Sequence, residues 1–77
     1  MEVTVLFFGQ IVDITQNASV KINDAKDTDA LVKELHSLYP ALSHSKYAIA
    51  VNKKMIQQNT ILQHNEEVAL LPPFSGG

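Results

Sequence analysis

Residues 66–77 read EEVALLPPFSGG, the stretch that decides the fold of this chain. Its first half is a short apolar run, and a run of that length predicts a β-strand over 66–71 rather than a buried helix. Pro72 and Pro73 end the strand, because neither proline can donate a hydrogen bond to a neighbouring strand. The sequence therefore predicts a domain over residues 1–73 that ends with a β-strand followed by a stiff Pro-Pro segment.

A tail of four residues, 74–77, follows the prolines and ends in two glycines. Fully extended, it reaches roughly 13 Å, far enough to enter another protein. Gly76 and Gly77 have no Cβ atoms, so they can pass a narrow channel and present the terminal carboxylate for adenylation. A Gly-Gly end taken alone is also typical of a frayed terminus. Joined to the strand order of the rest of the chain, it predicts a flexible arm whose terminal carboxylate is open to activation.

Upstream of the closing strand, apolar periodicity and turn residues divide the chain into short elements. Asp27 or Thr28 can cap one helix over residues 29–39, and Pro40 stops it. The apolar face of this helix is a stripe of leucines at i, i+4, i+7 spacing, namely Leu31, Leu35 and Leu38. The other predicted elements are strands at 2–8, 18–23, 47–51 and 55–56, a helical turn at 10–16 and an irregular turn at 61–62.

The order of these elements is strand, strand, helix and then two or three strands, which predicts an α+β domain. The first two strands can pair as a hairpin, and the strand at 47–51 is expected to be a central strand of the sheet. The crossover through the helix is expected to be right-handed, with the one main helix on one face of a mixed sheet. This is the layout of a ubiquitin-like β-grasp domain with a flexible C-terminal Gly-Gly tail.

Both faces of the predicted sheet are apolar. Successive residues of a strand point to opposite faces, and the first and last strands are apolar at nearly every position. One helix cannot cover both faces, so the second is expected to be an exposed apolar patch that contacts another protein. The alternative is that the helical turn at 10–16 and the loops bury it. The residues expected in the patch are Phe8, Met55 and Leu71.

The composition argues against several classes of function. The chain has 77 residues and a net charge of -2, so clustered positive charge for nucleic acid or an anionic membrane is not expected. No apolar stretch approaches the roughly 20 residues of a membrane span, and the amino terminus lacks the pattern of a secretory signal peptide. The absence of cysteine adds to this, and a cytoplasmic location is expected.

Side chains with catalytic or metal-binding patterns are scarce. His36, His44 and His64 lack the i, i+4 spacing that places two imidazoles on one metal, so they are expected at the surface and no metal site is expected. Glu66 and Glu67 are neighbours in a strand and point to opposite faces, so they are expected to be solvated edge charges. No nucleophile elbow or Gly-rich phosphate loop is present. The C-terminal carboxylate is therefore the candidate reactive group.

Three segments carry a family resemblance: VLFFG at 5–9, AIAVN at 48–52 and EVALLPPFSGG at 67–77. In order and spacing they resemble the small, sulfur-carrier subunits of molybdopterin synthases, over nearly the whole chain. The Pro-Pro-x-x-Gly-Gly ending is the specific part, since the similar thiamine-pathway carriers and ubiquitin-like modifiers usually lack the two prolines. The chain departs from many members at Asn65-Glu66, where Gly-Asp is common, and at residues 11–13, where basic residues are common. We expect the turn to survive with Asn65 and the pairing with the activating enzyme to differ.

The resemblance implies that a ubiquitin-activating-like adenylyltransferase uses ATP to adenylate Gly77, which a sulfur donor then converts to a thiocarboxylate. No cofactor stays bound to this chain. The carrier, once it holds the thiocarboxylate, would join the large synthase subunit in a heterotetramer. It would then give its sulfur to cyclic pyranopterin monophosphate to build the dithiolene of molybdopterin. The chain is then the sulfur-donating half of a two-protein sulfurtransferase whose catalytic side chains lie on the large subunit. The residues implied in partner contact are Phe8, Met55, Leu71, Pro72, Pro73, Phe74 and Ser75, with Gly76 beside the reactive Gly77.

Other interpretations of the same residues stay open. A carrier of this kind can serve thiamine synthesis or tRNA thiolation, and conjugating modifiers share the Gly-Gly end. Outside sulfur chemistry, the chain can be a non-enzymatic β-grasp interaction module with an idle tail. Deleting Gly76 and Gly77 separates the two classes, because a carrier then loses all activity whereas an interaction module keeps its partner.

Overall fold

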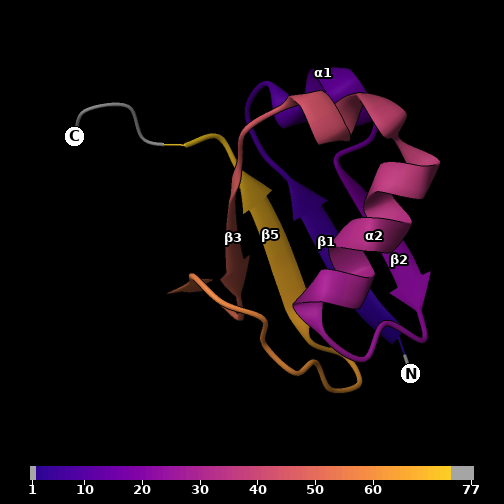
Figure 1. Cartoon of the computed structure of the whole chain (residues 1–77), viewed down its shortest axis with the longest axis vertical. Helices are drawn as coiled ribbons and strands as arrows, with labels where there is room; N and C mark the ends of the chain where they lie inside the picture. Colours follow the sequence, from indigo (N-terminus) through magenta and orange to yellow (C-terminus); the bar gives the residue numbers. More distant parts are fainter. Residues whose placement is uncertain (1, 74–77) are drawn as a thin grey trace.

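The computed structural model describes residues 2–73. They form a five-stranded sheet with one main helix packed on it (Figure 1). The predicted strands and helices are present, with ends that differ from the predicted ones by at most one residue, and a short 3-10 helix, η1, was not predicted. The elements are β1 (Glu2–Phe7), α1 (Ile11–Thr15), β2 (Ser19–Asn23), α2 (Thr28–Leu38), η1 (Pro40–His44), β3 (Ala48–Val51), β4 (Lys54–Ile56) and β5 (Glu67–Leu71).

The sheet is mixed, with strand order β2-β1-β5-β3-β4. β1 pairs antiparallel with β2, as the predicted hairpin requires, and parallel with β5. β3 pairs antiparallel with β5 on one side and with β4 on the other. The prediction of a central strand at 47–51 is confirmed, because β3 has a neighbouring strand on each side. The last segment of the chain inserts between β1 and β3, which makes β5 the middle strand of the sheet. This β-grasp arrangement brings the end of β5 beside the end of β1 (Figure 1).

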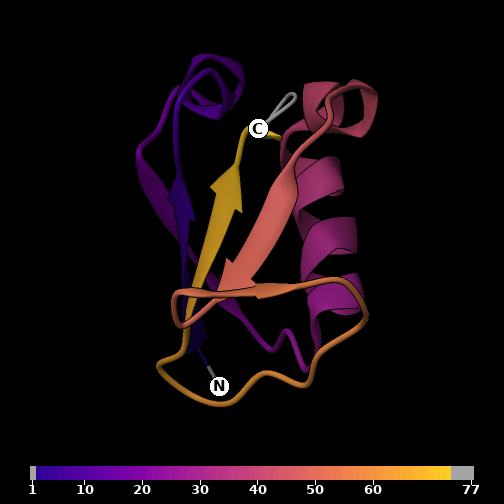
Figure 2. The ribbon, with the colours of Figure 1, turned by 90° about the vertical axis from the view of Figure 1, so that its left-hand side faces the viewer.

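The hydrophobic core lies between the sheet and α2, which runs along one face of the sheet (Figure 2). Leu31 and Leu35 of α2 and Leu42 of η1 are at most 1% exposed. The sheet side of the core consists of alternate positions of β1 and β5, namely Val3, Val5, Phe7, Val68 and Leu70. The strict alternation of these positions leaves the intervening side chains on the opposite face of the sheet.

One predicted core residue lies at the surface. Leu38 is 49% exposed, so the inward stripe of α2 ends one turn earlier than predicted. The helix stops at Leu38, and the chain turns at Tyr39, whose N–H donates to Leu35 O at 2.7 Å. The ring of Tyr39 packs edge-on against Phe7, with ring centroids 5.8 Å apart, and Pro40 then begins η1. Tyr39 therefore covers the core where Leu38 was expected to.

The amino-terminal end of α2 is bound to the long connection between β4 and β5. Asp27 is the cap, as predicted, and accepts a hydrogen bond from Ala30 N–H at 2.8 Å. Asn59 Oδ1 accepts from Asp29 N–H at 2.8 Å and from the Thr28 hydroxyl at 3.2 Å. Asn59 Nδ2 also donates to Asp27 Oδ2 at 3.3 Å. These bonds hold a connection with little secondary structure of its own against the helix.

Candidate functional site

An apolar groove of about 390 Å³ runs across the sheet face opposite α2; it is called the sheet groove below. Four strands build it, because the residues that alternate with the core positions point away from the helix. Its floor consists of cross-strand neighbours, with Ala69 of β5 opposite both Leu6 of β1 and Ala50 of β3. The groove is lined by Leu6, Phe8, Ala50, Lys53, Met55, Glu67, Ala69 and Leu71.

The three residues expected in an apolar patch all line the sheet groove. Phe8 is 43% exposed, Met55 is 49% exposed, and Leu71 is half-buried. Neither α1 nor a loop within residues 2–73 covers them, so the alternative in which those segments bury the face is wrong. Single exposed apolar side chains are common, but a contiguous set along one groove is typical of a protein contact surface. That a partner binds Phe8, Met55 and Leu71 stays a prediction.

The sheet groove ends where the chain leaves the sheet. Phe8 N–H donates to Leu70 O at 3.1 Å, so the ends of β1 and β5 lie together. Just beyond them Pro72 packs on Gly9, which has φ +58°. Pro72 is half-buried and Pro73 is exposed. The other predicted site residues, Phe74, Ser75, Gly76 and Gly77, lie outside the described residues.

Two charged side chains line the opposite end of the sheet groove. Lys53, in the turn between β3 and β4, is exposed, and Glu67, the first residue of β5, is half-buried. Asn52 joins the two segments, because its N–H donates to Glu67 O at 2.7 Å and its Oδ1 accepts from Glu67 N–H at 3.0 Å. The sheet groove thus has an apolar end at the chain exit and a charged end at the turn.

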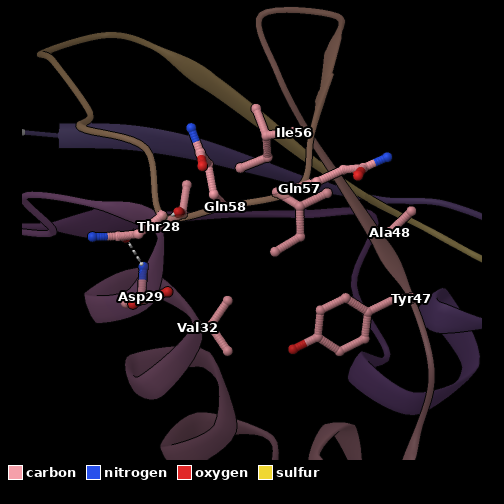
Figure 3. A pocket seen from close by; sticks show the side chains of 10 residues that line it. Thr28, Asp29, Val32, Tyr47, Ala48, Ile56, Gln57 and Gln58 are labelled. Carbon is pink, nitrogen blue, oxygen red and sulfur yellow. Dashed lines mark hydrogen bonds between the residues drawn. The ribbon is translucent and has the colours of Figure 1, made fainter.

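A second pocket, of about 260 Å³, lies on the helix side of the sheet, between α2 and the segments around β3 and β4 (Figure 3). Val32 and Ile56 give it apolar walls, and Tyr47 lies at one end. The Tyr47 hydroxyl is 2.7 Å from Nε2 of His36, which is half-buried instead of fully at the surface as predicted. Burial raises the pKa of Tyr47 above its usual 10.0, so the phenol stays neutral near pH 7. The arrangement holds α2 to the strand that follows it.

Glu66, the acidic residue just before β5, has hydrogen-bond partners within the domain. Glu66, expected to be a solvated edge charge, lies just before the strand and accepts from Asn52 Nδ2 at 2.8 Å and from Gln63 N–H at 2.6 Å. Asn65 has φ +67°, so the turn expected to survive with asparagine is formed.

Within residues 2–73, no three His, Asp or Glu side chains are grouped so that they could hold a metal ion. None of the helices in this part of the chain is long and apolar enough to cross a membrane.

Three residues at the site were not expected from the sequence. Lys53 and Glu67 line the sheet groove, and Gly9 supports Pro72 at the exit. The strand alternation that places Ala69 and Leu71 on the open face also places Glu67 there, so this signal was available. The contact between Gly9 and Pro72 joins segments that are far apart in the sequence, and nothing local in the sequence indicates it.

Known proteins resemble this chain over its full length. The model of the ThiS family matches residues 5–77. The molybdopterin synthase sulfur carrier subunit of Mycobacterium tuberculosis is 32% identical over 82 residues, which cover 100% of this chain and 99% of that protein. In a Helicobacter pylori complex of subunits 1 and 2 of molybdopterin-converting factor, a chain with 31% identity superimposes with a TM-score of 0.75 and full coverage of both chains. Small archaeal modifier protein 1 of Methanosarcina acetivorans, at 23% identity, shares the fold with a TM-score of 0.84, covering 99% of this chain and 96% of that one.

Proposed function

The chain belongs to the ThiS family, and from this premise we propose that it is the sulfur carrier subunit of a molybdopterin synthase. The observation that carries the proposal is the end-to-end similarity to a molybdopterin synthase sulfur carrier subunit, within a family match that includes the Gly76-Gly77 end. The two prolines before those glycines lead out of the central strand of the sheet.

In the proposed cycle the Gly77 carboxylate attacks the α-phosphate of ATP on an activating adenylyltransferase, which releases pyrophosphate and forms an acyl adenylate. A sulfur donor then displaces AMP and leaves a thiocarboxylate on Gly77. Its sulfur attacks a side-chain carbon of cyclic pyranopterin monophosphate and displaces an oxygen substituent from that carbon. Water then cleaves the resulting thioester, which leaves the sulfur on the pterin and restores the Gly77 carboxylate. Two such transfers, from two charged carriers, supply the two sulfurs of the dithiolene. ATP is consumed by the activating enzyme, and no cofactor stays bound to the carrier.

The described residues support a carrier more than an enzyme with its own catalytic side chains. The sheet groove has an apolar lining that includes Phe8, Met55 and Leu71, as a docking surface for a partner protein would, and it ends beside the exit at Pro72. A partner bound there would receive the tail next to the contact surface. The related chain of Helicobacter pylori is in a complex of subunits 1 and 2, which supports a large synthase subunit as this partner. A heterotetramer, docking with the adenylyltransferase and a cytoplasmic location are further parts of the proposal.

The test is reconstitution with the molybdopterin synthase large subunit of the same organism, using the charged carrier and cyclic pyranopterin monophosphate. We expect the full chain to bind the large subunit and yield molybdopterin. A chain without Gly76 and Gly77 keeps the sheet groove and should still bind, but should form no product. Full function of the shortened chain would contradict the carrier and favour the interaction module.

The alternative carriers differ only in the partner that accepts the sulfur. The ThiS family match is compatible with a carrier for thiamine synthesis or tRNA thiolation, and copurification of an enzyme of either pathway in place of the synthase large subunit would identify it. The archaeal modifier shares the fold at 23% identity, which carries no argument for conjugation. Isopeptide-linked adducts of the chain on other proteins would be needed to support that function.

A further inference from the structure

We propose that Lys53 binds a carboxylate of the large subunit and so selects the partner that docks on the sheet groove; this inference rests on the proposed function. Lys53 lies in the two-residue turn between β3 and β4, at the charged end of the groove. The sulfur cycle uses Gly77, and the chain leaves the sheet at Pro72, at the other end of the groove. A role for Lys53 is therefore one of recognition and not of sulfur chemistry.

The backbone at Lys53 has a conformation that lysine rarely adopts. Asn52 and Lys53 have φ +49° and +70°, the pattern of a hairpin turn for which Asn-Gly is the preferred pair. Asparagine tolerates the left-handed region, but a longer side chain is strained there. Gln16 also has a positive φ of +61°, and its side chain donates to Asp13 O at 2.7 Å, which gives a local reason. Within residues 2–73 the Lys53 side chain forms no such hydrogen bond, so the fold does not explain why lysine stands there.

The turn that carries Lys53 is held rigidly against β5. Asn52 bonds in both directions with the backbone of Glu67, and its Nδ2 donates to Glu66 Oε2 at 2.8 Å. These contacts fix where the Lys53 side chain begins, at the rim of the sheet groove. A side chain on a rigid element loses less conformational freedom when it binds, which favours a recognition role.

The charge of Lys53 requires a counter-ion once a partner covers the groove. Its ammonium forms no ion pair with the carboxylates of residues 2–73, although Glu67 lines the same end of the groove. A partner that covers the whole groove, from Phe8 at the chain exit past Met55 to the turn, would displace water from the charged end as well, and a buried ammonium is unfavourable unless an anion pairs with it. The geometry therefore calls for an acidic side chain on the partner, facing the turn between β3 and β4.

The experiment measures the Kd between this chain and the purified large subunit, by titration calorimetry at low and at high salt. Lys53→Glu should weaken binding by about tenfold or more at low salt, and the difference should shrink at high salt because screening weakens both attraction and repulsion. Lys53→Gly should also weaken binding without lowering the melting temperature, since glycine suits the turn. Lys53→Arg should keep the Kd within about twofold, because it retains the charge.

Two further variants, one outside the sheet groove and one in it, separate Lys53 from general charge effects. Lys54→Glu changes the net charge equally one residue away, in an exposed position that does not line the groove, and should leave the Kd nearly unchanged. Glu67→Gln, at the same end of the groove, should strengthen binding, because a partner carboxylate at Lys53 would be repelled by Glu67. Equal losses for Lys53→Glu and Lys54→Glu, or a loss for Glu67→Gln that matches that of Lys53→Gly, would overturn the inference. Failure of the unaltered chain to bind the large subunit would instead overturn the proposed function.

Discussion

Gly9 and Pro72 are packed so closely that a Cβ added to Gly9 would lie 2.7 Å from Pro72 Cγ. Gly9 also has φ +58°, a conformation in which a β-branched side chain is strained. The contact joins the second residue after β1 to the first residue after β5. It fixes the direction in which the chain leaves the sheet, and the proposed sulfur transfer depends on that direction.

Gly9→Val is therefore expected to disturb the exit. The added side chain strains the backbone and pushes Pro72 away, and the free energy of unfolding should fall by about 1–3 kcal/mol. Sulfur transfer to the large subunit should slow even at a temperature where the variant is fully folded. Denaturant unfolding and single-turnover sulfur transfer are the measurements. Gln10→Val, one residue on at an exposed position with φ -66°, is the control, and an equal effect there would contradict the role of the Gly9 contact.

Met55→Asp tests the sheet groove as the partner surface. Met55 is 49% exposed, so the change should leave the melting temperature nearly unaltered, but it places a charge in an apolar contact and should weaken large-subunit binding about tenfold or more. Leu38→Asp is a matched control, because Leu38 is also 49% exposed but lies at the end of α2, away from the groove. Calorimetric titration compares them. Similar Kd values for the two variants would show that the sheet groove is not the contact surface.

Phe8→Asp and Leu71→Asp extend the same test along the sheet groove. Both should weaken large-subunit binding while the domain stays folded, as expected for side chains that are exposed or half-buried on the open face. Thermal unfolding followed by circular dichroism checks the fold. Loss of the cooperative thermal unfolding transition in either variant would show that its side chain belongs to the core.

The sequence predicted the open apolar face of the sheet because β1 and β5 carry apolar side chains on both of their faces. It also predicted the cap at Asp27 and the turn at Asn65, where a short polar side chain satisfies a known backbone requirement. It placed Leu38 wrongly, because the helical period continues past the point where Tyr39 turns the chain onto Phe7. Strand order could not be read from local patterns, since the insertion of β5 between β1 and β3 is decided by contacts between distant segments. The position of Lys53 at the sheet groove was missed because a lysine does not signal the positive φ that it adopts.

The corrected position of Leu38 leads to a stability prediction. Leu35 is 0% exposed, so Leu35→Ala leaves a cavity and should lower the free energy of unfolding by about 2–5 kcal/mol. Leu38→Ala, at the exposed end of the same helix, should lower it by less than about 1 kcal/mol. Urea unfolding measures both. Comparable losses would mean that Leu38 is packed in the core after all.

Asp27 gives the domain a dependence on pH. Its pKa lies below the usual 3.8, chiefly because the carboxylate accepts the Ala30 N–H, with further contributions from Asn59 and Lys26. A lowered folded-state pKa means that the contribution of the charged cap is fully present above pH 3.8 and is lost as the pH falls through the lowered value. Asp27→Asn caps the helix without a charge. In thermal unfolding from pH 7 to pH 2, the melting temperature of the unaltered chain should exceed that of Asp27→Asn at neutral pH, and the difference should shrink in acid. Asp29→Asn is the control for loss of an equal charge, and an advantage that stays constant with pH would contradict the account.

The carrier role is tested most directly by the intact mass of the protein after incubation with its activating adenylyltransferase, ATP and a sulfur source. The account predicts a mass gain equal to the replacement of one oxygen by sulfur, located by fragmentation at Gly77. A chain lacking Gly77 should show no such gain under the same conditions. An unchanged mass under conditions that charge an established carrier would contradict the central claim that this chain carries sulfur on its last residue.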